Sequence, residues 1–161
     1  MNLASEYLEK IQSELGNSWP PQIYLERVLK SRTRPYQFPA LPKNADTEIH
    51  HTLLGIELKA GRRRMLCPDL ATARYLQVFA RLGCVAIAIP YDITRISLVA
   101  DELESSWHRM LLISDRLTTA RNKAFRTRIR TLIIGKVRDE IAQAGAGPYV
   151  PEFKRSTKQR I

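Results

Sequence analysis

The sequence has few of the residues on which secreted, redox and metal-binding sites depend. It contains only two cysteines and seven glycines in 161 residues. Cys67 and Cys84 do not have the spacing of a zinc-ligand pair, a redox motif or a disulfide framework. We therefore expect two buried, unpaired thiols.

Recognisable catalytic motifs are absent too. There is no nucleophile elbow, phosphate-binding glycine loop or dinucleotide fingerprint. The three histidines predict no metal site, because His50 and His51 are adjacent and cannot both face one ion from a strand, while His108 follows Trp107 on a predicted helix. The sequence therefore predicts no metal and no cofactor.

Long apolar runs are also missing. No stretch approaches the roughly 20 apolar residues that a membrane-spanning helix needs, and the first residues are polar and amphipathic, unlike a signal peptide. We expect a cytoplasmic protein without a membrane segment.

Acidic residues are scarce in comparison with basic ones. Twenty-six Lys and Arg stand against 16 Asp and Glu, which gives a net charge of +10. An excess of this size favours phosphate-bearing or otherwise acidic partners, so nucleic acid and an acidic protein are the two partner classes to consider. The length predicts a single domain over residues 1–161, with residues 145–161 as a flexible basic tail.

The clearest fold signal lies between residues 53 and 92. Leu53–Lys59 alternates apolar and polar residues with the period of a half-buried strand, and Arg63–Cys67 follows after a turn at Gly61, which predicts a β-hairpin. Val85–Pro90 is apolar throughout, as expected of an interior strand. We predict that it lies parallel to Arg63–Cys67 through a right-handed crossover.

A helix is predicted between those two strands. Asp69 is placed to cap its N-terminus and Gly83 to end it in a left-handed conformation. Arg74, Gln77 and Arg81 recur at spacings of three and four opposite the apolar face, so we expect these three side chains to face solvent or a ligand.

The remaining sequence predicts further helices. Residues 32–46 contain three prolines without periodicity and are expected to be an extended connection. A helical pattern resumes by about Ala100 and would carry Asp101, Glu102 and Glu104 in its first turn. Residues Ile93–Val99 fit either a short strand or the start of this helix, and we favour the helix. The predicted fold class is α/β (α+β): a small mixed sheet surrounded by about five helices, the others being Leu3–Leu15, Gln22–Ser31 and Thr118–Ala144.

The last of these helices has an unusual charge pattern, with no acid between Thr118 and Asp139. We hypothesise that it contacts nucleic acid together with the hairpin turn, and that both converge on one face. Alternatively, the charges form a solvated face, dock an acidic protein, or meet the Asp101–Glu104 turn of a second copy in a homo-oligomer. The candidate residues are Lys59, Arg62, Arg63, Arg64, Arg121, Lys123, Arg126, Arg128, Arg130, Lys136 and Arg138.

A weaker catalytic hypothesis concerns Glu57 and Lys59, which form an E-x-K string on a predicted strand. Metal-dependent nucleases of the restriction-enzyme type combine such a string with an acid on the preceding strand to hold Mg²⁺. The string is short and common in charged proteins, so outward-facing strand residues are the favoured interpretation. The sequence favours a non-enzymatic protein that binds nucleic acid or takes part in a nucleoprotein assembly.

Overall fold

The computed structural model describes residues 2–42 and 46–147 as an α+β fold. It contains four long helices, the short helix α2 and two small antiparallel sheets. The long helices are α1 (Leu3–Leu15), α3 (Leu70–Leu82), α4 (Ile93–Leu117) and α5 (Lys123–Ala144). The described part of the chain has no helix that is both long and apolar enough to cross a membrane.

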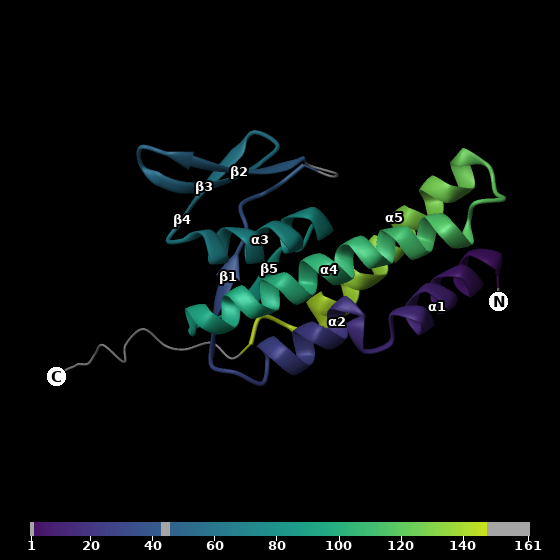
Figure 1. Cartoon of the computed structure of the whole chain (residues 1–161), viewed down its shortest axis with the longest axis horizontal. Coiled ribbons are helices and arrows are strands. Elements are labelled where there is room, and N and C mark those ends of the chain that lie inside the picture. The colour runs from purple at the N-terminus through teal and green to yellow at the C-terminus, as the bar shows by residue number, and fades with distance from the viewer. Residues whose placement is uncertain (1, 43–45, 148–161) are drawn as a thin grey trace.

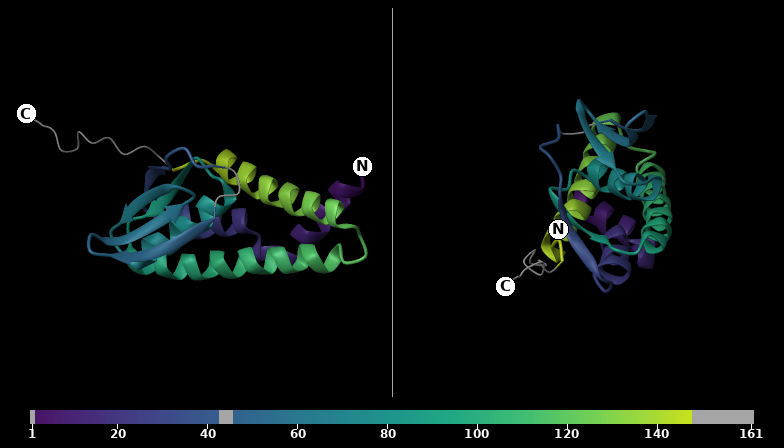
Figure 2. Two further views of the ribbon diagram at one scale, coloured as in Figure 1. Left: turned by 90° about the horizontal axis from the view of Figure 1, so that it is seen from above. Right: turned by 90° about the vertical axis from the view of Figure 1, so that its left-hand side faces the viewer.

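The sheets lie toward one end of an elongated molecule, and helices run along its whole length (Figure 1). Helices α4 and α5 run antiparallel along its long axis, and α1 packs against both of them. Helix α3 lies beneath the three-stranded sheet and contacts each of its strands (Figure 2). Between α1 and the first strand, a 3₁₀ turn (Gly16–Ser18) leads into α2 (Pro20–Ile23) and a π-helical turn (Tyr24–Val28).

The predicted hairpin is confirmed and forms part of a meander. Strand β3 (Gly55–Ala60) pairs with β4 (Arg63–Cys67) on one side and with β2 (Thr47–Thr52) on the other. Strand β2 was not predicted. The first two residues of the predicted strand, Leu53 and Leu54, instead form the exposed turn between β2 and β3.

The predicted parallel crossover is wrong. Strand β5 (Ala86–Pro90) does not join the hairpin; it pairs antiparallel with β1 (Thr33–Gln37) in a separate sheet. Strand β1 lies in the proline-rich stretch that was expected to be only a connection. Its Pro35 is tolerated because β1 has one neighbour in the described sheet, so the missing amide donor interrupts no second ladder.

Two tyrosines occupy the edge of β5 where the predicted parallel strand would have paired. The Tyr24 hydroxyl accepts a hydrogen bond from the Ala88 amide at 2.9 Å and donates to the Gly145 carbonyl at 2.6 Å. The Tyr75 hydroxyl donates to the Ala88 carbonyl at 2.7 Å. These bonds satisfy backbone groups that would otherwise be buried without partners, and burial raises the pKa of Tyr24 to about 12.

Helix α3 confirms both predicted caps but not the predicted exposed stripe. Asp69 accepts from the Thr72 amide at 2.7 Å, and Gly83 ends the helix at φ 81°. Gln77, however, is buried, and its side-chain amide donates to Thr47 of β2 at 3.2 Å. The stripe is covered because β2 lies on one side of α3 and α4 on another.

Helix α4 begins at Ile93, where Asp92 caps the Thr94 amide at 2.9 Å. The helical interpretation favoured for Ile93–Val99 is confirmed, and the acidic group Asp101–Glu104 therefore lies inside the helix and not, as predicted, in its first turn. Helix α5 begins at Lys123 with Asn122 as its cap, later than the predicted Thr118.

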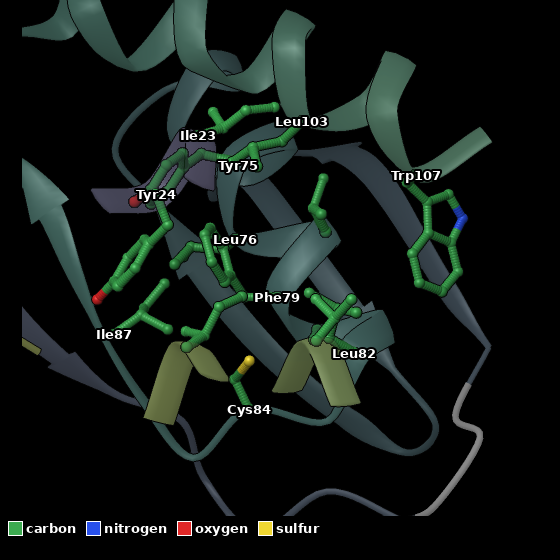
Figure 3. Close-up of a cluster of buried hydrophobic side chains, with 14 of the residues drawn as sticks. Ile23, Tyr24, Tyr75, Leu76, Phe79, Leu82, Cys84, Ile87, Leu103 and Trp107 are labelled. Atoms are coloured by element: carbon green, nitrogen blue, oxygen red, sulfur yellow. The ribbon is translucent and has the colours of Figure 1, made fainter. Parts of the chain in front are cut away.

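One cluster of buried side chains joins the two parts of the fold. Figure 3 shows Tyr24, Tyr75 and Phe79 packed together, and buried residues of α5 belong to the same cluster. Cys67 and Cys84 are buried free thiols as predicted, and burial raises the pKa of Cys84 to about 12. Residues 145–147 pack against this core, whereas the rest of the predicted tail, 148–161, lies outside the described residues.

Candidate nucleic-acid interface

Helix α5 is held in place by a narrow apolar stripe. Its buried residues recur every four positions, and they are Ile129, Ile133, Val137 and Ile141. The helix packs against α1, α2, α3, α4 and β5. This stripe uses one side of the helix, so the basic residues are distributed over the remaining surface.

Helical geometry divides the predicted basic run between two sides of α5. Lys123, Arg126 and Arg130 follow one another at spacings of three and four and therefore share one side, which we call the basic flank. Arg128 lies two positions from both Arg126 and Arg130 and points to a different side. Asp115 of α4 lies 3.7 Å from Arg130, so the basic flank borders α4.

Two arginines near the start of α5 are partly engaged or buried within the fold. Arg121 donates to the Tyr7 hydroxyl at 3.1 Å, and its guanidinium lies 5.8 Å from the Tyr7 ring and 5.5 Å from the Phe125 ring. It therefore helps to hold α1 against α5. Arg126 is half-buried, and its Nε is buried without a hydrogen-bond partner in the part of the chain that the structure describes.

The last basic residues of the run also differ in role. Arg138 lies over two glycines: a methyl group on Gly135 would come within 3.2 Å of its guanidinium, and one on Gly83 within 3.5 Å. Gly83 ends α3, so Arg138 places a cation at the negative end of that helix dipole. Arg138 is therefore a structural residue, whereas Lys136 is half-buried on α5.

The basic hairpin residues are partly matched by carboxylates on the same sheet face. Strand register places Lys59 between Glu48 and Arg64, and Glu57 lies one row further along that face. Arg64 donates to Glu57 at 3.2 Å. Arg62 and Arg63 are exposed at the β3–β4 turn.

The two predicted basic regions are not brought together. The start of α5 lies at one end of the long axis, and the β2–β3–β4 sheet lies toward the other end in both views that show this axis horizontally (Figure 1 and the left panel of Figure 2). The expectation that Arg62–Arg64 and Arg121–Arg130 share one contact surface is therefore wrong. The fold separates them because the full length of α4 runs between the sheet end and the α4–α5 turn.

The E-x-K residues do not assemble into an acidic cluster. Strand β2 supplies the preceding strand that a nuclease site would need, and its Glu48 pairs in register with Lys59. Yet Glu57 is engaged by Arg64, and residues 2–42 and 46–147 contain no group of three or more His, Cys, Asp or Glu that could hold a metal. This arrangement gives the nuclease hypothesis no support.

The acidic group of α4 is engaged within the chain. Arg74 donates to Glu104 at 2.7 Å and also to Asp101, and these hydrogen bonds raise the pKa of Arg74 above its usual range. Glu102 lies 3.5 Å from Arg27. Little free negative charge is left there to attract the basic helix of a second copy.

No protein-family model, curated protein or solved structure matches this chain. Its function must therefore be inferred from the chemistry of its own side chains.

A second basic site escapes prediction from the sequence because its residues are far apart in the chain. A depression is lined by Ser31, Arg32, Tyr91, Asp92 and Arg95. Arg32 precedes β1 in the proline-rich stretch, and Arg95 lies in the first turn of α4. The antiparallel pairing of β1 with β5 brings the two segments together, and no local pattern in the sequence predicts that pairing.

Proposed function

We propose that this protein is a non-enzymatic, cytosolic protein that binds the phosphate backbone of nucleic acid through the first half of α5. The observation that carries the proposal is the shortage of acidic partners there. Lys123 and Arg128 are exposed, and neither has an ion pair in the described residues. Arg130 has a carboxylate only at 3.7 Å, and such exposed pairs contribute about 0–1 kcal/mol.

The start of α5 adds to this positive charge. Its N-cap is the neutral Asn122, whose side chain accepts from the Phe125 amide at 2.8 Å, and the first turn contains no acid. The positive end of the helix dipole therefore stays uncompensated, which favours an anion near the basic side chains. By contrast, α1 carries Glu6 in its first turn.

Backbone contacts of this kind position a protein without reading sequence. We expect affinity for duplex and single strands of unrelated sequence, with a steep dependence on salt. Two or three neutralised phosphates correspond to a slope of log K against log salt of about −2 to −3.

The direct test reverses two exposed charges, Lys123→Glu together with Arg128→Glu. Arg126 is left unchanged because it is half-buried, so its reversal would disturb the fold. The matched control, Lys30→Glu with Arg109→Glu, also reverses one lysine and one arginine at exposed positions, both outside α5. Fluorescence anisotropy with labelled duplex and single strands at low salt is expected to show at least a tenfold loss for the α5 variant and less than a threefold loss for the control.

Two outcomes contradict the proposal. One is the absence of binding by the unmodified chain to either nucleic acid at low salt, which favours an acidic protein as the partner. The other is an equal loss of affinity in the α5 variant and in the control, which would show that affinity depends only on the net charge of the protein.

A further inference from the structure

The depression lined by Ser31, Arg32, Tyr91, Asp92 and Arg95 is built on backbone pairing. The last pair of the β1–β5 ladder is Thr33 with Pro90, and the Tyr91 amide donates to the Arg32 carbonyl at 3.0 Å just beyond it. This bond fixes the two walls relative to each other. The depression is therefore preformed in the folded chain.

Its charge is positive and largely unmatched. Neither Arg32 nor Arg95 has a carboxylate within ion-pair distance among residues 2–42 and 46–147. The one acid of the lining, Asp92, is used as the cap of α4, where it accepts from the Thr94 amide at 2.9 Å. Arg27, next to the depression, is paired with Glu102. Two guanidinium groups thus line the depression without a fixed counter-ion, which suits a phosphate group.

Tyr91 adds an aromatic surface to these charges. Tyr91 is 47% exposed, and the Arg32 guanidinium lies over its ring, 5.3 Å from the centroid. An exposed ring beside arginine is the combination that holds a nucleobase by stacking while its phosphate is bound electrostatically.

We propose that the depression binds a nucleotide, with the phosphate on Arg32 and Arg95 and the base against Tyr91. The ligand is either a free nucleotide or one unit of a single strand, since both present the same phosphate and base. The site is distinct from the basic region of α5. It lies at the start of α4, whereas α5 begins after its end, and the 25 residues of α4 span about 37 Å (Figure 1).

Isothermal titration calorimetry with the full chain tests this site. The probes are adenosine monophosphate, adenosine, inorganic phosphate and a single-stranded octanucleotide. We expect the monophosphate to bind at least tenfold more tightly than adenosine or phosphate. In the Lys123→Glu, Arg128→Glu variant, which lacks the proposed α5 contact, tighter binding of the octanucleotide than of the monophosphate identifies a strand as the source, and equal or weaker binding identifies a free nucleotide.

Three substitutions test the contacts to the phosphate and to the base separately. Arg32→Gln and Arg95→Gln are each expected to weaken monophosphate binding at least fivefold. Tyr91→Leu is expected to weaken the monophosphate similarly while leaving the affinity for phosphate unchanged. Arg109→Gln, an exposed position further along α4, is the control and should change neither.

The proposal is overturned if the monophosphate does not bind at millimolar concentration, or if its binding survives both arginine substitutions. Loss of phosphate and monophosphate in equal measure in Tyr91→Leu overturns the stacking role. The pair Lys123→Glu and Arg128→Glu should leave monophosphate binding intact, so failure of the nucleotide site and failure of the α5 proposal can be distinguished.

Discussion

The two ends of this molecule treat charge and polarity differently. At the sheet end, polar side chains of α3 and of the β2–β3–β4 sheet have partners within the fold: Arg64 meets Glu57, Arg74 meets Glu104, and Gln77 meets Thr47. At the helical end, formed by α1, the end of α4 and the start of α5, Lys123 and Arg128 have no such partner in the described residues. Basic residues on these two scaffolds therefore differ in how much of their charge is matched within the fold.

The difference arises from the two kinds of scaffold. Strand register brings the residues of neighbouring strands opposite one another, so the acids Glu48 and Glu57 share a face with Lys59 and Arg64. In the first half of α5 the neighbours of a basic residue lie three or four positions away on the same helix, and these are again basic or neutral. A free charge on α5 thus requires an external anion to be neutralised.

The largest expected effect comes from removing the packing that holds the helical end together. Ile129 is fully buried on α5, so Ile129→Ala should lower the free energy of unfolding by about 2–5 kcal/mol, as for other large-to-small core changes. Chemical denaturation followed by circular dichroism measures it. A loss below about 1 kcal/mol would mean that α5 is held by something other than its apolar stripe.

The next effect concerns the polar network of the sheet end at alkaline pH. The Tyr24 pKa is raised to about 12 in the folded chain against about 10 when unfolded, so the folded state holds this proton more tightly. Its contribution to stability is complete below pH 10 and is lost as the pH rises from 10 to 12. Thermal unfolding across this range should show a steeper decline for the unmodified chain than for Tyr24→Phe, and parallel curves would contradict it.

Reversing charge at the hairpin sharpens the comparison of the two ends. Arg62→Glu with Arg63→Glu alters two exposed basic residues near the carboxylates of the sheet, so we expect about a threefold loss of nucleic-acid affinity. This is smaller than the tenfold loss expected for the α5 pair. A hairpin loss equal to or larger than the α5 loss in the same anisotropy assay would reverse the assignment of the main contact.

The smallest expected effect comes from making the hairpin resemble α5. Glu48→Gln with Glu57→Gln removes the two acids that share a face with Lys59 and Arg64, and should raise affinity about twofold. Titrations at low and high salt measure this gain, which should vanish at high salt because it is electrostatic. A gain that persists at high salt would point to a conformational change in the sheet.

Local patterns in the sequence predicted several elements, but not the strands β1 and β2 or the partner of β5. The hairpin and the caps Asp69 and Gly83 depend on residues close together in the chain, and both were predicted. The partner of β5 was not predicted, because Tyr24 and Tyr75 complete its second edge from positions far along the sequence.

The same limit applies to the candidate sites. The basic run of α5 is visible in the sequence, but the docking of Arg138 over Gly83 depends on the packing of α5 against α3. The Arg32 and Arg95 depression exists only because β1 and β5 pair. Charge density could therefore be predicted, whereas its neutralisation and its distribution in space could not.

The hydroxyl groups of Tyr24 and Tyr75, which hydrogen-bond to the backbone of Ala88, also affect how this molecule avoids uncontrolled self-association. A strand from another molecule cannot extend the β1–β5 ribbon on the β5 side, since both phenols already occupy the backbone groups of its central residue. On the β1 side, Pro35 offers no amide hydrogen to an incoming strand. No further strand can therefore pair along the β5 edge, and the β1 edge lacks one hydrogen-bond donor. Both features disfavour fibril-like stacking of this apolar segment.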